Sequence, residues 1–337
     1  MGSEATEAVS APSSEAQFAA CAFLQNCALG AAGGHAKKGG MTDAPQTCAL
    51  IGHFAEPRIA ESAVVAVAAL RERGYEVLVA DDEPAAAKLS KTTPAPRQEL
   101  ARRSRFVIAV GGDGTLLQAA RLVVGRDVPL LGINRGRLGF LTDVMPQDVA
   151  ASINALLDGR CESDRRPLLE AQLHSGTGEK NSLLAMNDVV LLRRDTGSML
   201  DFDTRVDGRY VNSHRGDGMV VATATGSTAY ALSCGGPIVD PKLNVLVMAP
   251  ICPHTLADRP IVVSGDSHIE IRSLDRGPGL AQVACDGAHL GDMQPGDRLE
   301  ISAVGGSITL LHPPGYDYFR LLRSKLRWGR GEELRER

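Results

Sequence analysis

Short apolar runs alternate with longer amphipathic stretches over the first part of the chain. Runs such as "TCALIGHF", "YEVLVA", "RFVIAV" and "VPLLGIN" are rich in Val, Ile and Leu and too short for helices. Helical patterns such as "RIAESAVVAVAALRERG" separate most of them. Because strands buried on both faces read as continuous apolar runs, this alternation predicts an α/β domain with a parallel, helix-covered sheet over residues 41–145.

The pattern changes after Pro146. One helical stretch, "PQDVAASINALLDG", leads into alternating segments that include "LLEAQLH", "LDFDTRVDGRYV", "SHIEIRS" and "RLEISAV". Turn signals such as "DGR" and "PGD" stand between them. Residues 146–315 are therefore predicted to form a β-rich, largely antiparallel domain.

The two ends differ from these domains. Residues 1–40 consist mostly of small residues, and acidic residues stand where a secretory signal would be basic, which predicts a disordered N-terminal extension. Residues 316–337 contain "YFRLLRSKLRWG", whose apolar and basic periodicity suits a helix on a membrane surface or, more commonly, a segment that docks on its own protein.

Composition narrows the class of protein. The 337 residues are 44% hydrophobic, carry a net charge of −4 and show no basic cluster before the C-terminal tail, which argues against nucleic-acid binding. No apolar run is long enough to cross a bilayer, so no membrane partner is expected. The seven cysteines are odd in number and form no C-x-x-C pair, which favours reduced thiols and a cytoplasmic location over disulfides or zinc.

The segment "FVIAVGGDGTLLQAA" places glycines and one carboxylate at the end of a predicted strand. Glycines allow backbone amides to approach a phosphate at the start of the following helix. Asp113 would repel that phosphate unless it held a magnesium ion or took a proton from an attacking hydroxyl. The combination is typical of a kinase, and the alternative is a glycine turn in which Asp113 caps the helix.

Further polar segments follow. "GINRGRLGFLTD" ends the next strand and offers apolar faces for a base, although packing explains Leu138 and Leu141 equally well. In "AMNDVVLLRR", Asn187 and Asp188 suit a ribose or an adenine edge, or form a polar turn. His254 is interpreted as a structural histidine and Asp286 as a hairpin turn.

The densest polar segment is "HRGDGMVVATATGSTAYALSCGGPIVDP". Its hydroxyls and glycines supply donors for a phosphorylated ligand, and Tyr230 supplies a ring for stacking. Taken in order, "GGDGT", "NxxxLGFL", "ND", "TGSTAYxLSxGGPI" and "APICPHTLADRPIV" resemble the motifs of the NAD kinases, over roughly Cys48 to Trp328.

The resemblance implies a fold, a reaction and a set of site residues. The fold would be a Rossmann-like α/β domain, then a β-rich domain, with the C-terminal segment returning to the first. NAD kinases transfer the terminal phosphoryl group of ATP or polyphosphate to the 2′-hydroxyl of the adenosine ribose of NAD, with a divalent ion such as Mg²⁺ carried by the phosphates and no fixed metal site. Asp113 matches the catalytic aspartate; the matched binding residues are Gly112, Gly114, Thr115, Leu117, Phe140, Asn187, Asp188, Arg215, Asp217, Thr228, Ala229, Tyr230 and Ser233.

The family also implies a homodimer or homotetramer in which one subunit completes its neighbour's site. Two alternatives stay open on the residues alone. A lipid kinase of the diacylglycerol or sphingosine type shares "GGDGT" but does not require "TGSTAY". A non-catalytic dinucleotide sensor would bind NAD without forming NADP.

Overall fold

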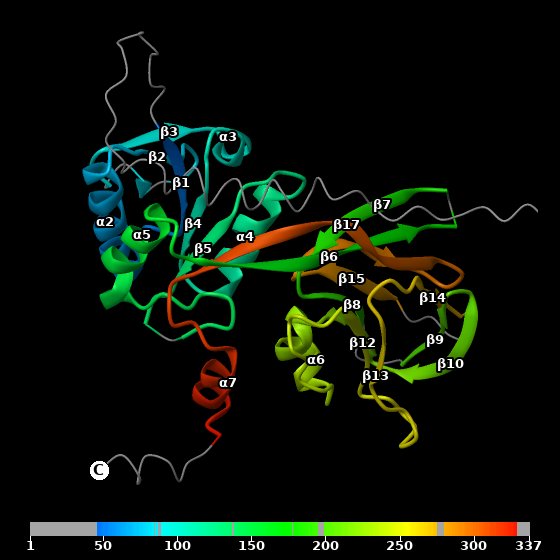
Figure 1. The fold of residues 1–337 in the computed structure, drawn as a ribbon. Coiled ribbons are helices and arrows are strands. Elements are labelled where there is room, and N and C mark those ends of the chain that lie inside the picture. The colour runs from blue at the N-terminus through cyan, green and yellow to red at the C-terminus, as the bar shows by residue number, and fades with distance from the viewer. Residues whose placement is uncertain are drawn as a thin grey trace, which may run out of the picture.

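The computed structural model describes residues 46–328, except 84, 87–88, 137, 177, 195–198 and 275–279. The predicted extension at residues 1–40 lies outside this range. Within the described residues, the chain forms an eleven-stranded and a six-stranded sheet. Figure 1 shows a parallel half and an antiparallel half side by side, joined by long strands that run through both.

The parallel half matches the apolar runs of the sequence. In sheet order its strands are β5 (Leu130–Ile133), β4 (Val107–Val110), β1 (Thr47–Ile51), β2 (Glu76–Ala80) and β3 (Thr92–Ala95). All of these neighbours pair in parallel. Sequence analysis did not identify β3, which contains Pro94 and lies at the sheet edge, where the missing N–H of proline is tolerated.

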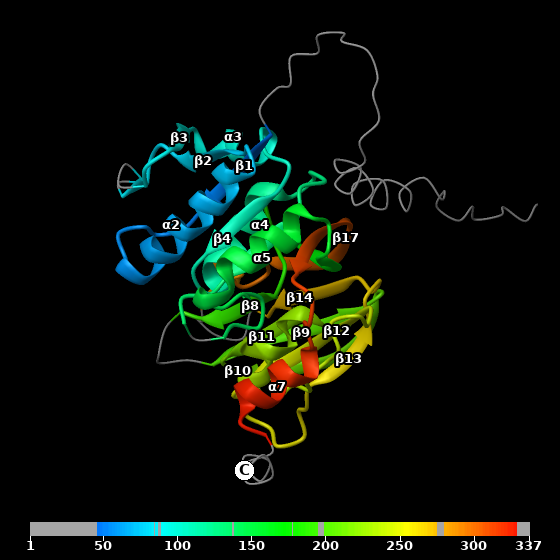
Figure 2. The same cartoon turned by 60° about the vertical axis from the view of Figure 1, so that its left-hand side comes forward.

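Helices cover both faces of this sheet. Along β4, Ile108 and Val110 face the core that includes helices α2 (Pro57–Glu72) and α5 (Val149–Leu157), whereas Val107 and Ala109 face the core that includes α3 (Arg97–Arg102) and α4 (Asp113–Val123). Figure 2 shows α2 and α5 together over the same part of the sheet. The core of the parallel half thus extends through α5, beyond residue 145.

The antiparallel half is a sandwich of two sheets. The six-stranded sheet runs β13 (Ile261–Ser264), β12 (Val245–Ile251), β11 (Gly218–Thr223), β8 (Asp188–Arg193), β15 (Ala281–Cys285) and β16 (Ala288–Met293). The facing part of the larger sheet contains β10 (Arg209–Gly216), β9 (Leu200–Val206), β14 (Ile269–Ser273), β17 (Arg298–His312), β6 (Glu162–His174) and β7 (Lys180–Ala185). Apolar side chains such as Phe202 and Val221 fill the space between the sheets.

Strands β6 and β17 run through both halves. Ile301 of β17 pairs with Ile269 of β14 in the sandwich, and Leu310 pairs in parallel with Leu130 of β5. A register shift between Ala303 and Ser307 interrupts its pairing with β6. The two halves therefore share one continuous sheet. The predicted class, an α/β domain followed by a β-rich domain, is confirmed.

The C-terminal segment contacts both halves. Helix α7 (Tyr318–Leu326) begins after Asp317, whose carboxylate accepts hydrogen bonds from the backbone N–H groups of Phe319 and Arg320. The Tyr318 hydroxyl donates to the carbonyl of Val239 at 3.2 Å. None of the helices described between residues 46 and 328 has the length and apolar character needed to cross a membrane.

Candidate active site between the two halves

Asp113 is the first residue of α4, directly after β4. Its Oδ2 atom accepts a hydrogen bond from the backbone N–H of Phe140 at 2.8 Å, and Oδ1 accepts from those of Leu141 and Thr142 at 3.0 and 3.1 Å. The Thr142 hydroxyl also donates to Oδ1, at 3.1 Å. The N-cap residue of α4 is Gly112, and no side chain caps the helix. Asp113 therefore anchors the loop at residues 138–144 instead of capping α4.

Gly139 lies against this carboxylate. A Cβ atom at Gly139 would overlap Oδ1 of Asp113 and the hydroxyl of Thr142. Gly132 is similarly confined, because a Cβ atom there would stand 2.7 Å from Leu116 and 2.9 Å from Thr142. Both glycines lie in the quoted "GINRGRLGFLTD" segment, but the sequence does not show which atoms they face.

The start of α4 leaves room for a ligand. A Cβ atom at Gly112 or Gly114 would meet no atom of the described residues within 4 Å. Backbone amides at a helix N-terminus favour anions, so the predicted phosphate contacts have an open approach. Thr115, by contrast, is buried, and its side chain lies where a Cβ atom of Gly111 would be.

Two apolar residues predicted near the adenine differ in their contacts. Leu117 is partly buried and packs against the core on the α4 face of the sheet. Phe140 is half-buried, and the ammonium group of Lys325 lies 5.4 Å from the centroid of its ring. Helix α7 thereby touches the loop that Asp113 anchors.

A second aspartate, Asp286, anchors the Asn187–Asp188 segment. The Asp286 carboxylate accepts hydrogen bonds from the backbone N–H groups of Met186, Asn187 and Asp188 at 2.7, 2.8 and 3.1 Å. Asp286 occupies the turn between β15 and β16 with φ of 45°. Sequence analysis interpreted this residue as a hairpin turn and missed its role as an anchor.

The anchored segment is electrostatically unusual. Burial and the nearby charge of Asp286 raise the pKa of Asp188 to about 6, although a hydrogen bond from the backbone N–H of Tyr230 opposes the rise. Burial also raises the pKa of Asp286. Among the described residues, the buried Oδ1 atom of Asn187 has no hydrogen-bond partner. An amino or hydroxyl group of a ligand would satisfy that acceptor.

The "TGSTAY" segment forms a 3-10 turn, η4 (Thr225–Thr228), and a short helix, α6 (Tyr230–Ser233). Hydroxyls in this segment and just before it are used inside the protein. Thr223 donates to the carbonyl of Met186 at 2.7 Å, and Ser227 donates to that of Ala224 at 2.7 Å. Gly226 leaves no room for a Cβ atom against the backbone of Asn187. This close packing places η4 against the Asn187–Asp188 segment.

Other predicted residues lie farther along the same sheet. Ala222 pairs with Asp188 and Gly218 with Leu192, so Asp217 lies at the opposite end of β11, roughly 17 Å from Asp188 at about 3.3 Å per residue. Asp217 forms an ion pair with Arg193 at 2.8 Å, and Arg215 is exposed. Partial burial raises the pKa of Tyr230, and the charges of Asp217 and Asp188 add to the rise.

The remaining predicted residues belong to the same turn. Thr228 is partly buried and donates to the carbonyl of Thr225 at 3.3 Å. Ala229 is the residue between η4 and α6, and Ser233 ends α6. These side chains lie on the face of the six-stranded sheet opposite the sandwich core, where Ala224 and Ala231 are buried.

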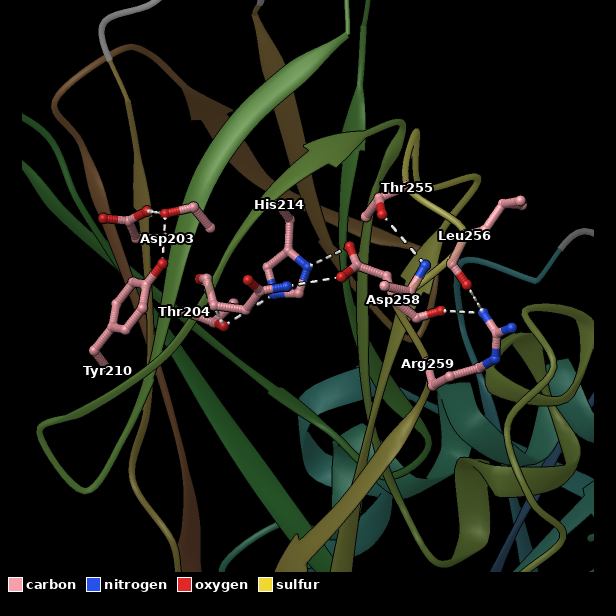
Figure 3. Close-up of polar contacts among 11 residues, drawn as sticks. Asp203, Thr204, Tyr210, His214, Thr255, Leu256, Asp258 and Arg259 are labelled. Carbon is pink, nitrogen blue, oxygen red and sulfur yellow. Dashed lines mark hydrogen bonds and ion pairs between the residues drawn. The ribbon is translucent and has the colours of Figure 1, made fainter.

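The "PHTLADRP" segment is held by a histidine that sequence analysis did not single out. His214 Nδ1 lies 3.0 Å from Oδ2 of Asp258, and its Nε2 lies 3.0 Å from the hydroxyl of Thr204 (Figure 3). The order of these three groups resembles the nucleophile, base and acid of a hydrolase. Because Thr204 is fully buried, no substrate can reach its hydroxyl, and the three groups form a structural hydrogen-bond chain. The side chain of His254, interpreted as structural, is exposed, and only its backbone N–H bonds to Arg215.

Arg121 connects the two anchored segments. From the last turn of α4, it donates to the carbonyls of Cys285 and Asp286 at 2.9 and 3.0 Å. The helix that begins with Asp113 is thus attached to the hairpin that holds Asn187 and Asp188. One polar segment follows a parallel strand at the start of α4, and the other, Asn187–Asp188, belongs to the sandwich. This arrangement is typical of a nucleotide-binding protein of the kinase type.

Comparisons with known proteins identify the family. Residues 49–161 match the model of the ATP-NAD kinase N-terminal domain, and residues 186–312 match that of the C-terminal domain. An NAD kinase of Nitrosococcus oceani is 43% identical over 282 residues, which cover 83% of this chain and 96% of that protein. The chain belongs to the NAD kinase family, and the resemblance seen in its motifs is confirmed.

Two solved structures share the fold. A yeast NADH kinase complexed with NADH superposes with a TM-score of 0.78 and 25% identity, over 86% of this chain and 89% of that one. An NAD kinase from Archaeoglobus fulgidus in complex with ATP gives a TM-score of 0.65 and 28% identity, over 84% and 98%. These matches favour the NAD kinases over the lipid kinases.

Proposed function

We propose that this protein transfers the terminal phosphoryl group of ATP to the 2′-hydroxyl of the adenosine ribose of NAD, forming NADP. Its membership of the NAD kinase family makes it an enzyme that phosphorylates NAD. ATP is proposed as the donor in preference to polyphosphate because the related archaeal structure holds ATP.

The observation that carries the proposal is the pair of acceptors at Asn187 and Asp188. The Oδ1 atom of Asn187 is buried without a partner among the described residues, and Asp188 beside it is buried with a raised pKa. An adenosine supplies the donors that such acceptors need, through its exocyclic amino group and its ribose hydroxyls. We therefore assign adenosine binding to these two side chains.

Asp113 is proposed to orient the attacking hydroxyl and to accept its proton. Its Oδ1 atom receives three hydrogen bonds from the loop, whereas Oδ2 receives one, from Phe140. A carboxylate oxygen has two lone-pair directions, so Oδ2 retains one for a substrate hydroxyl. Phosphoryl transfer depends chiefly on position and charge neutralisation, and the four fixed donors hold this carboxylate in one orientation.

The remaining predicted residues complete the proposal. Gly112, Gly114 and Thr115 would lie beside the phosphates, and Leu117 and Phe140 beside the adenine. The nicotinamide side would be formed by residues from a homodimer or homotetramer: Arg215, Asp217, Thr228, Ala229, Tyr230 and Ser233. The distance between Asp217 and Asp188 along β11 is one reason to expect that two subunits contribute.

A divalent ion is expected with the nucleotide. Among the described residues, no group of three His, Cys, Asp or Glu side chains is placed to hold a metal. The proposal assigns Mg²⁺ to the phosphates of ATP.

One assay tests the function. The protein is incubated with NAD, Mg²⁺ and either ATP or polyphosphate, and NADP is measured with an NADP-specific dehydrogenase. We expect NADP from ATP and its loss when the divalent ion is chelated. NAD binding without NADP would support the sensor alternative, and phosphorylation of a lipid alcohol in place of NAD would support a lipid kinase.

A further inference from the structure

A buried cluster of charged side chains lies where the two halves meet, outside the residues assigned to the substrates. Its centre is His312, the last residue of β17, whose side chain is 2% exposed. His312 Nδ1 lies 2.9 Å from Oδ2 of Asp143, and Nε2 lies 3.7 Å from Oδ2 of Asp164. The ring of Tyr316 stacks on the imidazole with centroids 3.8 Å apart.

The cluster continues to the "TGSTAY" turn. Arg166, which is 3% exposed, donates through Nη2 to Asp164 at 2.6 Å. Its Nη1 donates to the hydroxyl of Thr225, the first residue of η4, at 3.2 Å. Arg166 thus contacts one of the two predicted substrate segments directly.

At its other end the cluster reaches the loop held by Asp113. Asp143 is covalently adjacent to Thr142, whose backbone N–H and hydroxyl both bind the Asp113 carboxylate. Thr142 also accepts hydrogen bonds from the side chain of Asn134. A displacement of Asp143 would therefore be transmitted to the orientation of Asp113.

We propose that His312 is a positioning residue that couples the Asp113 loop to the Thr225–Thr228 turn, through Asp143 on one side and Asp164 and Arg166 on the other. In the described part of the chain its hydrogen-bond, ion-pair and ring partners are Asp143, Asp164 and Tyr316, none of which is assigned to NAD or ATP. It acts by fixing the distance between the two segments that bind these substrates. The proposal rests on the proposed NAD kinase reaction for its kinetic consequences, but the coupling itself is independent of turnover.

Protonation of His312 strengthens this coupling. Burial by itself would lower the pKa of His312, but the hydrogen bond with Asp143 and the nearby charges of Asp143 and Asp164 outweigh burial and raise it above its ordinary value of 6.5. A raised pKa means that the stabilising interaction is complete below about 6.5 and is lost as the pH rises through the folded-state value. Deprotonation leaves two carboxylates facing each other without the cation between them.

Three titratable groups near His312, namely Asp164, Tyr316 and Cys161, have pKa values outside this window. Burial would raise the pKa of Asp164, but His312 and Arg166 lower it overall, so Asp164 stays ionised. Burial raises the pKa of Tyr316 to about 12 and that of Cys161, near Asp143, to about 11. Loss of the coupling above neutral pH is therefore assigned to His312.

The test compares two histidines on the same pair of strands. His312→Gln removes the charge, whereas His174→Gln, the control, alters a histidine at the far end of β6 that pairs with Glu300 at 2.9 Å. We expect His312→Gln to raise KM for NAD about five-fold near neutral pH with kcat within about two-fold, the scale of a coupling between sites. In the wild type, KM for NAD rises when the pH exceeds the pKa of His312 in the folded protein. In His312→Gln, KM for NAD does not change over this pH range, and in His174→Gln it follows the wild type.

Amide hydrogen exchange separates this proposal from the proposed reaction, because it needs no turnover. In His312→Gln, exchange at Phe140, Leu141 and Thr142 and across residues 225–229 becomes faster, and in His174→Gln it does not. Equal kinetics and exchange in the two variants would overturn the coupling. If the wild type forms no NADP but exchange still becomes faster in His312→Gln and not in His174→Gln, the proposed reaction is overturned and the coupling is kept.

A second variant keeps the test decisive if His312→Gln does not fold. Thr225→Val preserves the shape of the side chain and removes the hydroxyl that accepts from Arg166. We expect KM for NAD to rise about three-fold, with kcat nearly unchanged. An unchanged KM, together with unchanged exchange at residues 140–142, would show that the cluster is a structural core and does not position the substrate segments.

Discussion

Two aspartates in Asp-Gly pairs each hold three consecutive backbone N–H groups of a distant segment. Asp113 binds those of residues 140–142, and Asp286 binds those of residues 186–188. Asp113 lies in the first turn of a helix, whereas Asp286 lies in a left-handed hairpin turn. The same hydrogen-bonding arrangement thus occurs in both halves, on unrelated local structures.

The difference lies in what each carboxylate can still do. Asp113 is partly exposed beside glycines with open space, and within the described part of the chain its Oδ2 atom accepts from Phe140 alone. Asp286 is also partly exposed, but partial burial raises its pKa, and its carboxylate is occupied by the three N–H groups of the segment that it holds. We infer that the first anchor also performs chemistry, whereas the second only shapes a binding segment.

Replacement of the first anchor should have the largest effect. In Asp113→Asn, the amide oxygen can keep the three hydrogen bonds at the Oδ1 position. The NH₂ group at the Oδ2 position loses the bond from the N–H of Phe140 and cannot accept the substrate proton. We expect kcat to fall by a factor on the order of 10² or more, while KM for NAD changes much less. Steady-state kinetics and a thermal melt check this result.

Asp148→Asn is the matched control, because Asp148 also stands at the start of a helix but is exposed and is not among the predicted site residues. It should keep normal turnover. If Asp113→Asn turns over normally but melts at a lower temperature than the wild type, Asp113 only anchors the loop and is not a catalytic residue.

Replacement of the second anchor, Asp286, should reduce stability and NAD binding more than it reduces turnover. In Asp286→Asn, the NH₂ group at the Oδ2 position would face the N–H of Met186, which now donates at 2.7 Å. We expect the free energy of unfolding to fall by about 2–3 kcal/mol, the scale of losing a buried charge-assisted hydrogen bond, and KM for NAD to rise more than kcat falls. Urea unfolding and kinetics measure both.

Asp207→Asn provides the comparison, since Asp207 occupies the β9–β10 turn with φ of 51° and binds the backbone N–H of His268. It should lose some stability and leave KM for NAD unchanged. If Asp286→Asn lowers kcat as strongly as Asp113→Asn does, the contrast between the two anchors is wrong.

Local patterns were sufficient to predict the elements, but not these anchors. The run "VIAV" followed by glycines predicted β4 and the start of α4, because burial and backbone freedom are properties of adjacent residues. The bonds of Asp113 span 27 to 29 residues, and those of Asp286 span 98 to 100. No periodicity encodes such contacts, so they required the fold.

Continuity between the halves was also hidden in the sequence. The alternation in "RLEISAV" predicted the antiparallel part of β17, but not that Leu310 pairs in parallel with Leu130. The family motifs supplied the candidate site residues, among them Asn187 and Asp188, and included Gly139 without showing what it contacts. Arg121 and His312 lie in none of the quoted motifs. Their roles depend on which distant atoms they meet.

A smaller effect tests the packing around the first anchor. In Gly139→Ala, the added Cβ atom would overlap the Asp113 carboxylate and must displace it or the loop. We expect kcat/KM to fall about ten-fold, since displaced catalytic groups lose rate steeply, with a modest loss of stability. Gly305→Ala, in a part of β17 where a Cβ atom meets nothing within 4 Å, should behave as the wild type.

The smallest expected effect concerns Asp188, in the segment that the second anchor holds, and separates NAD binding from stability. The pKa of Asp188 is raised from 3.8 to about 6 in the folded protein, so folding favours the protonated carboxyl. The resulting contribution to the free energy of unfolding is complete below about pH 4 and is lost as the pH rises through 6. Asp188→Asn removes the buried charge near Asp286, so the apo protein should gain about 1 kcal/mol relative to wild type near pH 7 and almost nothing near pH 4. Urea unfolding at the two pH values measures the gain, and KM for NAD should rise in the same variant. A gain equal at both pH values would show that the charge of Asp188 is not its cause.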